Sequence, residues 1–377
     1  MKKEELGIYV HIPFCKSKCY YCDFISFTNQ CDQIEPYIQK VLQEMQQYDI
    51  SNYNVTTIYI GGGTPSCIDE KYIKQLLEAL NRKLVDNETK FEEIEITIEI
   101  NPGTITKKKL EQYKKSGVNR ISIGLQSTND ILLKQIGRIH TYQEFLDAYQ
   151  LIQAAGFENI NIDFMIGLPN QTIQDIKQTL AEIQRLNPNH VSVYSLIVEE
   201  GTKIEQLITN GKLQLPDEEL ERQMYWYVKN TLELNGYKHY EISNFAREGK
   251  ESRHNLNCWE QMEYIGLGVA AHSYLKGVRY SNSGFTELKE WNFADKKIEE
   301  TQNLKDKKKE YMLLGLRKIE GVSIKKFKEK YRDNPIFLYR KELEKLVEQG
   351  LLQIDGDFIR LTNKGIDLAN LVWEEFV

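Results

Sequence analysis

The sequence predicts an α/β protein, with an open, partial (β/α)6 barrel of the TIM type followed by a smaller C-terminal domain. Three observations predict this fold. Six short runs rich in Ile, Val or Tyr recur in the first 200 residues, most are followed by a segment with helical periodicity, and the pattern changes near residue 217. Alternating strands and helices form parallel sheets with right-handed crossovers. Six such units are fewer than the eight that close a full barrel, so we expect an open one.

The expected strands contain the β-branched and aromatic residues that are typical of strands. They are Ile8–Ile12, Thr57–Ile60, Ile94–Ile100, Arg120–Leu125, Ile160–Ile166 and His190–Leu196. The clearest helical segments between them are Pro36–Tyr48, Glu70–Leu84, Lys107–Ser116, Tyr142–Ala155 and Thr172–Leu186. Gly117 and Gly156 follow two of these helices, at positions where a left-handed C-terminal cap belongs.

Beyond the barrel the pattern differs. A long helix, Asp217–Asn235, precedes two apolar stretches at Tyr240–Phe245 and Ile265–Tyr274. The charged segment Asn303–Lys309 is either a linker or the start of a helix, and two helical segments follow it. Apolar runs flank Asp355–Asp357, which predicts a β-hairpin on a Gly turn and hence a winged-helix-like end. We therefore expect three parts, residues 1–215, 216–302 and 303–377.

Composition and charge exclude several classes of protein. Of the 377 residues, 41% are apolar and 28% are charged, which is a globular balance. No apolar run approaches the ~20 residues of a membrane span, and the first residues lack the apolar stretch of a secretory signal. We expect a cytoplasmic protein with at most peripheral membrane association. The net charge of −6 argues against a nucleic-acid-binding protein.

The cysteine spacing is the strongest chemical feature of the sequence. Cys15, Cys19 and Cys22 form a C-x₃-C-x₂-C run directly after the first expected strand. Three thiolates on one loop suit three irons of a [4Fe–4S] cubane and leave the fourth iron free for a substrate or cofactor. The alternatives are a chance cluster and a zinc site with His11 as the fourth ligand. Zinc sites usually pair two such motifs, and the other cysteines are scattered singly, so we expect iron–sulfur.

Other distinctive residues fall at the carboxyl ends of the expected strands, where parallel α/β barrels carry their chemistry. They are Gly61–Pro65, Glu99, Gln126 and Asp163. A run of glycines lets a ligand approach the backbone closely. Each feature also has a simpler interpretation. The glycines can form a plain turn, Glu99 can face solvent in the same alternation as Glu95, and Asp163 can bond to backbone groups.

Several motifs in order make the sequence resemble a known family. The segment IPFCKSKCYYCDF is followed by GGGTP, TIEINP, SIGLQS, IGRIHT and IDFMIGLP. This combination resembles the HemN/HemW family of radical S-adenosylmethionine (SAM) proteins over nearly the whole chain. The resemblance implies a radical SAM partial barrel followed by a HemN-type C-terminal domain. It also implies a [4Fe–4S] cluster that reduces SAM to methionine and a 5′-deoxyadenosyl radical.

The resemblance also implies which residues bind SAM. It puts the methionyl end of SAM near Tyr9, Gly62 and Glu99. The further family positions that contact SAM are occupied here by Tyr21, Gly63, Thr64, Gln126, Arg138 and Asp163. A surface salt bridge is the simpler role for Arg138, but its place in the connection after the fourth strand favours the SAM role.

Two features place the sequence on the HemW side of this family. Phe24 stands where the oxygen-independent coproporphyrinogen III oxidases have an additional cysteine. The heme-binding signature of the HemW group, His-Asn-x-x-Tyr-Trp, is similar to the segment His254–Trp259, which has Cys258 in place of tyrosine. A neutral imidazole is a good axial ligand of heme iron, so the resemblance makes His254 the expected ligand. Cys258 is either a second iron ligand or a buried small residue.

The resemblance therefore implies a heme chaperone that binds a [4Fe–4S] cluster, SAM and heme and transfers heme to acceptor proteins. By analogy with the family, the resemblance also implies a homodimer. It implies no coproporphyrinogen III oxidase activity and leaves open whether SAM is cleaved. Three other functions stay open. They are oxidative decarboxylation of coproporphyrinogen III to protoporphyrinogen IX, heme degradation by a radical SAM methyltransferase, and a binding module in the C-terminal unit.

Overall fold

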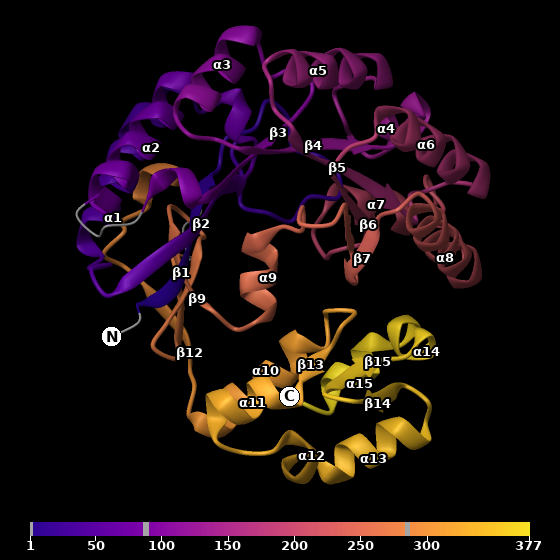
Figure 1. The fold of residues 1–377 in the computed structure, drawn as a ribbon. Helices are drawn as coiled ribbons and strands as arrows, with labels where there is room; N and C mark the ends of the chain where they lie inside the picture. Colours follow the sequence, from indigo (N-terminus) through magenta and orange to yellow (C-terminus); the bar gives the residue numbers. More distant parts are fainter. Residues whose placement is uncertain (1–2, 86–89, 283–286) are drawn as a thin grey trace.

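The computed structural model describes residues 3–85, 90–282 and 287–377. Within these residues the fold is built on one sheet whose strands run in the order β12-β11-β10-β9-β1-β2-β3-β4-β5-β6-β8-β7. Helices cover the outer side of its curved central part, and a smaller domain lies below the open side of the curve (Figure 1). The central strands are β1 (Glu4–Ile12), β2 (Tyr53–Gly62), β3 (Glu95–Ile100), β4 (Arg120–Gln126), β5 (Asn159–Ile166) and β6 (His190–Ser195).

These six strands pair in parallel and in chain order, as the sequence predicts. The predicted helices between them are also confirmed, as α1 (Ile34–Gln47), α2 (Glu70–Val85), α3 (Lys107–Lys115), α5 (Tyr142–Ala154) and α6 (Ile173–Leu186). The sequence analysis missed two short helices, α4 (Asp130–Gln135) and α7 (Lys203–Thr209). β1 and β6 do not pair with each other, because β9 and β8 occupy their outer edges. The barrel is therefore open.

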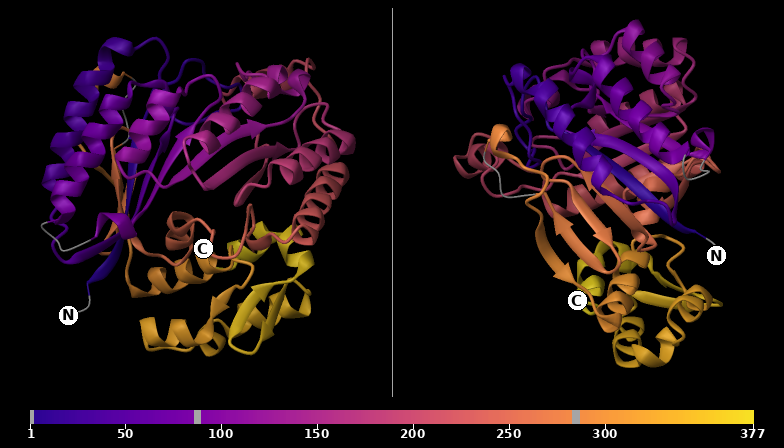
Figure 2. Two further views of the ribbon diagram at one scale, coloured as in Figure 1. Left: turned by 45° about the horizontal axis from the view of Figure 1, so that its top comes forward. Right: turned by 90° about the vertical axis from the view of Figure 1, so that its left-hand side faces the viewer.

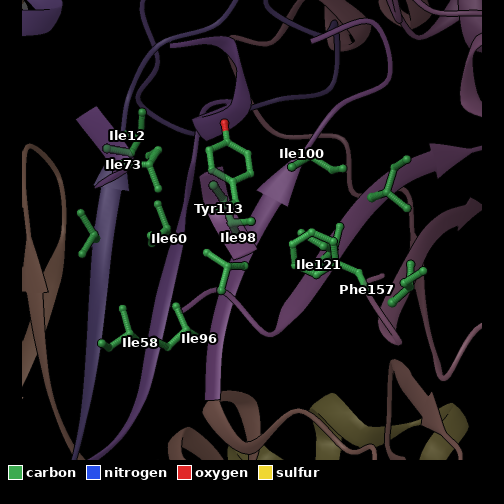
Figure 3. Packing of buried hydrophobic residues seen from close by; sticks show 14 of the residues in the cluster. Ile12, Ile58, Ile60, Ile73, Ile96, Ile98, Ile100, Tyr113, Ile121 and Phe157 are labelled. Atoms are coloured by element: carbon green, nitrogen blue, oxygen red, sulfur yellow. The ribbon is translucent and has the colours of Figure 1, made fainter. Parts of the chain in front are cut away.

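The two faces of the central strands differ in chemistry. Ile58, Ile96 and Ile121 are fully buried in the core beneath the helices, and Tyr113 of α3 lies next to Ile98 in the same cluster (Figure 3). The intervening residues of β3 to β6 are mostly polar and point to the other face. A closed barrel fills its interior with branched apolar side chains. Here the apolar residues of the alternation form the core under the helices, and the polar residues line the interior of the barrel.

Both edges of the sheet carry strands that the sequence analysis did not place. β9 (Glu263–Leu267) pairs in parallel with β1, and β10 (His272–Leu275), β11 (Val278–Ser281) and β12 (Lys297–Thr301) continue antiparallel. At the other edge β8 (Asn244–Ala246) pairs antiparallel with β6 and with β7 (Lys238–Glu241). The apolar stretches at 240–245 and 265–274 thus form strands that extend the sheet beyond β6 and β1, where β8 and β9 pair with strands far away in the chain.

Two helices complete the barrel region. The predicted long helix is α8 (Glu218–Leu234), and the side chain of Asp217 caps it by accepting from the backbone N–H of Leu220. The short helix α9 (Arg253–Trp259) contains the expected heme-binding segment. α9 lies on the open side of the curved sheet, between the β1–β9 part and the β6–β7 part (Figure 1).

The C-terminal domain has a core of its own, which includes Phe327 and Leu343. Asn303 caps α10 (Leu304–Gly315) through its side chain, so the charged segment at 303–309 is the start of a helix. The predicted hairpin is confirmed as β14 (Leu352–Asp355) and β15 (Phe358–Leu361), with Gly356 in the turn at a φ of +58°. The remaining elements are β13 (Val322–Ser323), α11 (Ile324–Tyr331), α12 (Pro335–Leu338), α13 (Arg340–Glu348), α14 (Asn363–Asp367) and α15 (Ala369–Glu374).

The C-terminal domain contacts the barrel region through α9, which packs against α10. Both views in Figure 2 show this domain beside the barrel rather than inside it. The guanidinium of Arg317 lies over the ring of Trp259 at 4.4 Å and over that of Trp373 at 4.7 Å. Among the described residues, none of the helices has the length and apolar character needed to cross a membrane.

Candidate functional site

The cysteine loop follows β1 and is held by backbone hydrogen bonds at each end. The N–H of Cys15 donates to the carbonyl oxygen of Phe27 at 3.0 Å, and that of Cys22 donates to Cys19 at 3.2 Å. The three cysteines are free and half-buried. Burial raises the pKa of the Cys22 thiol to about 11. Such thiols become thiolates only when a metal binds them.

The donor set of this loop fits a cubane better than a single metal ion. In the described part of the chain, no three His, Cys, Asp or Glu side chains converge on the position of one ion. The thiolates of a cubane bind different irons, so they need no such convergence. Both ring nitrogens of His11 are engaged, Nδ1 with the hydroxyl of Tyr9 at 3.0 Å and Nε2 with the carbonyl oxygen of Ile25 at 3.0 Å. His11 is therefore not free to act as a fourth zinc ligand.

The triple glycine lies where β1, β2 and the cysteine loop meet. Gly62 has a φ of +112°, and a Cβ there would lie 2.5 Å from the imidazole of His11. A Cβ at Gly63 would lie 3.0 Å from the sulfur of Cys15. The glycines thus permit a close approach of backbone to the cysteine loop, which a plain turn would not require.

Glu99 faces the interior of the barrel, so the solvent-facing interpretation is wrong. Its Oε1 accepts from the hydroxyl of Tyr59 at 2.8 Å, and its Oε2 accepts from the N–H of Gly62 at 3.2 Å. Burial raises the pKa of Glu99 to about 7, against the opposing effect of the Tyr59 hydrogen bond. The ring of Tyr9 stacks beside that of Tyr59, with centroids 6.3 Å apart. A carboxyl group in this state suits a ligand that brings an ammonium group.

Arg138 connects the cysteine loop to the end of β3. Its Nη2 donates to Oδ1 of Asn101 at 2.6 Å, and its Nη1 lies 3.6 Å from the sulfur of Cys19. Asn101 in turn donates to Oγ1 of Thr64 at 2.8 Å. Arg138 makes no ion pair with any residue that the structure describes, so the simpler role as a surface salt bridge is not found.

Gln126 combines two features that are rare without a ligand. It ends β4 with a φ of +59°, which is uncommon for a residue that has a side chain. Its Oε1 is buried and has no hydrogen-bond partner among the described residues. Buried polar atoms nearly always have a partner. A hydroxyl or amino group of a ligand would supply one.

Asp163 accepts hydrogen bonds from side chains, so the simpler interpretation, a bond to backbone groups, is not found among the described residues. Ser122 donates to its Oδ2 at 2.7 Å and Asn161 donates to its Oδ1 at 2.7 Å. Burial raises the pKa of Asp163. Both partners come from strands on the polar inner face, so the network is internal to the barrel.

Two aromatic residues of the cysteine loop lie in different surroundings. Tyr21 packs against an apolar cluster that includes Ile136 and Met165, and burial raises its pKa. Phe24, which stands in place of the additional oxidase cysteine, is 61% exposed. Phe24 therefore contributes no thiol and little packing at this position.

His254 lies at the end of the barrel opposite the cysteine loop. The backbone N–H groups of Arg253 and His254 both donate to the carboxylate of Glu95, at 3.1 Å each. Oγ1 of Thr57 is hydrogen-bonded to Nδ1 of His254 at 2.9 Å, and the ring of Tyr59 lies 5.1 Å from the imidazole. We call Thr57, Glu95, Arg120 and α9 the floor of the barrel. We call the loop Cys15–Cys22 with Gly61–Thr64, Glu99, Gln126, Arg138 and Asp163 the rim.

The imidazole of His254 is neutral and partly engaged. Burial, assisted by the charge of Arg120, lowers its pKa to about 4. The structure gives its Nε2 no hydrogen-bond partner among the described residues. If Nδ1 donates to Thr57, Nε2 keeps its lone pair for a metal. Burial raises the pKa of Cys258 to about 11, and Arg317 covers one face of Trp259.

A buried chain of hydrogen bonds connects the rim to the floor. Asn161, which donates to Asp163, is bonded through Oδ1 to Nδ1 of His190 at 2.6 Å. Nε2 of His190 lies 2.7 Å from the hydroxyl of Tyr240, which accepts from the N–H of Ser252 at 3.3 Å. Ser252 is the N-cap of α9. The two ends of the barrel are therefore structurally connected.

The sequence analysis did not single out several residues of this interior. Thr57, Tyr59, Asn101, Arg120 and His190 all lie on the polar inner face or at the end of a central strand. The available signal was the strict alternation in segments such as RISIGLQ and NINIDFMI. A polar residue at every second position of a buried strand indicates a lined interior.

Comparison with known proteins defines the class. Residues 9–183 match the radical SAM superfamily, and residues 302–368 match the HemN C-terminal domain. With the open barrel and the cysteine loop, these matches define a radical SAM protein. The chain is 40% identical to the heme chaperone HemW of Lactococcus lactis, over 100% of this chain and 98% of that protein. The chain belongs to the HemW family.

Further relatives and one solved structure agree. The chain is 38% identical to the heme chaperone HemW of Bacillus subtilis over 98% of each chain. It is 32% identical to that of Escherichia coli over 100% of this chain and 99% of the relative. The coproporphyrinogen III oxidase HemN of Escherichia coli, described as a radical SAM enzyme, superimposes with a TM-score of 0.83. That match covers 100% of this chain and 91% of the other at 23% identity, which shows a common fold.

Proposed function

We propose that this protein is a heme chaperone. It carries a [4Fe–4S] cluster on Cys15, Cys19 and Cys22, binds SAM at the rim, binds heme through His254 and transfers the heme to acceptor proteins. Membership of the HemW family supports this proposal, because the relatives bear the name heme chaperone. Phe24 is exposed to solvent at the position of the additional oxidase cysteine, which is consistent with a chain that does not rely on that cysteine.

The single observation that carries the heme assignment is the state of His254. Thr57 orients the ring through Nδ1, burial keeps the ring neutral with a pKa of about 4, and Nε2 has no partner among the described residues. A neutral, oriented imidazole is the form that binds heme iron. Cys258 is protonated in its buried setting, which favours its role as a small buried residue over a thiolate ligand.

For SAM, the proposal assigns the rim. A cluster on the cysteine loop would supply one-electron chemistry to SAM at its free iron. The unpartnered Oε1 of Gln126 and the raised pKa of Glu99 support a polar ligand between these side chains. The full set of proposed SAM-binding residues is Tyr9, Tyr21, Gly62, Gly63, Thr64, Glu99, Gln126, Arg138 and Asp163.

We propose that the chain is organised in three parts, residues 1–215, 216–302 and 303–377. The separate apolar core of the C-terminal domain supports the last boundary. The expected partners are heme and heme-acceptor proteins, with a second copy of the chain as a further partner and no nucleic acid.

The heme assignment is tested by titrating anaerobically reconstituted protein with hemin and following the Soret band. We expect His254→Ala to weaken binding by about tenfold or more and to shift the band, because the axial ligand is lost. His272→Ala is the matched control, since His272 is an exposed histidine of β10. Unchanged binding by His254→Ala at equal iron content would contradict the assignment.

The same material tests the rival enzymes. Incubation with coproporphyrinogen III, SAM and a reductant should yield no protoporphyrinogen IX. Incubation of the heme complex with SAM and a reductant should leave the Soret band intact. Product formation in the first reaction would show an oxidase, and loss of the band in the second would show heme degradation. Either result would replace the chaperone proposal.

A further inference from the structure

Arg120 is a buried charge that has no hydrogen-bond or ion-pair partner among the described residues. Its side chain, at the start of β4, is 2% exposed. Over the described residues, its guanidinium donates no hydrogen bond and forms no ion pair, and its Nε is fully buried. A buried charge is costly unless it is paired and hydrogen-bonded. Arg120 therefore requires water or an anion in the interior of the barrel.

Two carboxyl groups of the interior interact with the charge of Arg120, but neither accepts a hydrogen bond from it. Glu99 and Asp163 feel the charge of Arg120, but both are bonded to other groups. Glu99 accepts from Tyr59 and Gly62, and Asp163 accepts from Ser122 and Asn161. The pKa of Glu99, at about 7, further reduces the negative charge available at neutral pH. The hydrogen-bond donors of the Arg120 guanidinium are therefore left for a ligand.

The neighbours of Arg120 on both adjacent strands also lack partners. Thr97 of β3 and Asn159 of β5 are in register with Arg120. Oγ1 of Thr97 and Oδ1 of Asn159 are buried and unbonded among the described residues. Unpaired buried polar groups are rare, and here three of them lie side by side on three strands. Together a guanidinium and a hydroxyl make a donor set for a carboxylate.

This donor set lies close to His254. On β2, Thr57 is hydrogen-bonded to the imidazole of His254. Tyr59, two residues further along the same strand, is in register with Thr97 of β3. Thr97 is in turn in register with Arg120 of β4. Two residues of a strand span about 7 Å. The charge of Arg120 also contributes to lowering the pKa of His254. A ligand with its iron at Nε2 of His254 and an acidic side chain directed toward the rim would reach Arg120.

We propose that Arg120 binds a propionate carboxylate of heme inside the barrel, with Thr97 donating a second hydrogen bond. This inference rests on the proposed heme binding at His254 and specifies how the porphyrin is oriented. Arginine suits this task because its planar guanidinium binds a carboxylate through two parallel hydrogen bonds and stays charged at any working pH.

The test compares two ligands that differ only in their carboxylates. Hemin and hemin dimethyl ester are titrated into the full-length, anaerobically reconstituted protein, and Soret absorbance gives each affinity. We expect the wild type to bind hemin about tenfold more tightly than the ester, and Arg120→Gln to abolish that preference by weakening hemin alone. Thr97→Val should reduce the preference about twofold to fivefold, because it removes a neutral donor.

Two controls keep the result specific. Arg340→Gln changes an exposed arginine of α13 and should leave the preference intact. Iron content and the cluster spectrum show whether Arg120→Gln is folded, and Arg120→Lys, which keeps the charge, should retain part of the preference.

The outcomes separate this inference from the function on which it rests. If the wild type binds neither hemin nor its ester, the proposed function fails and this inference fails with it. If the wild type binds both and Arg120→Gln keeps the same preference, only the inference is overturned. If Arg120→Gln instead weakens SAM binding and leaves hemin unaffected, the carboxylate at Arg120 is that of SAM, which also overturns it.

Discussion

The rim and the floor of the barrel are assembled in different ways. The rim residues lie in the carboxyl half of a central strand or in the segment that follows it, so the order of strands in the sheet brings them together. The floor combines Thr57 and Glu95 with α9, and the contact between Glu95 and Arg253 joins residues 158 positions apart. The rim therefore depends on local sequence, whereas the floor depends on the docking of a distant helix. Changes at the rim should affect ligands, and changes at the floor should also affect stability.

The largest expected effect is at the rim. Cys19→Ser should abolish cluster assembly, because a hydroxyl is a poor replacement for one of only three thiolate ligands. Iron and sulfide analysis after anaerobic reconstitution measures the loss, from about four of each to near zero. Cys31→Ser, which changes an exposed cysteine outside the loop, is the control and should keep the cluster. If the floor is independent, apo Cys19→Ser still binds hemin. If Cys19→Ser lost both the cluster and hemin binding, the rim and the floor would not be independent.

The next effect is at the floor. Glu95→Ala removes the carboxylate that accepts two backbone N–H groups at the start of α9. We expect a loss of about 3 kcal/mol in the free energy of unfolding, because two hydrogen bonds to a carboxylate are lost in a partly buried setting. Urea unfolding measures it. Glu93→Ala, at an exposed neighbouring position, should change the stability by less than about 0.5 kcal/mol. Equal effects of the two variants would show that α9 is not held by Glu95.

The third prediction concerns pH. The pKa of His254 is lowered to about 4 in the folded protein, below the usual value of about 6.5. Between these values the unfolded chain binds a proton that the folded chain does not, so stability falls as the pH falls through this window. His239, with a pKa of about 4, adds a loss of the same sign.

Asparagine does not titrate, so His254→Asn lacks this pH dependence. When the pH falls from 7 to 5, the free energy of unfolding of the heme-free variant should decrease by about 2 kcal/mol less than that of the wild type. Urea unfolding at the two pH values provides the measurement, with His272→Asn as the exposed control. Parallel pH profiles for the wild type and His254→Asn would mean that the imidazole is not buried at the floor.

The smallest effect is expected where α9 meets the C-terminal domain. Glu260, directly after α9, forms ion pairs with Lys318 at 3.1 Å and Lys326 at 3.4 Å. These groups are partly exposed, so Glu260→Gln should cost less than about 1 kcal/mol and less still at high salt. Thermal unfolding at two salt concentrations tests this. A salt-independent loss above about 2 kcal/mol would mean that the charge pair, rather than packing, holds the domain in place.

The sequence was sufficient for features with a local cause. Strand and helix positions followed from hydrophobic periodicity, and the cysteine loop followed from its spacing. Strands β9 to β12, which extend the sheet beyond β1, were not predicted, because a short run of residues does not show which strand it pairs with. The choice between a linker and a helix at Asn303 required the observed cap. Glu99 was ambiguous for a related reason, since alternation alone does not tell a solvent-facing side from a lined interior.

By itself, the sequence determined the six-stranded parallel core and the place of the cysteine motif directly after the first strand, because each depends on residues within one strand–loop–helix unit. Only the tertiary structure decided that α9 lies at the opposite end of the barrel, that Thr57 is bonded to His254, and that Arg120 lies buried without a hydrogen-bond partner in the described part of the chain. These facts arise from contacts between residues far apart in the chain. The free energy of each such contact depends on how deeply the groups are buried and on whether they have hydrogen-bond partners. A local sequence pattern contains neither kind of information.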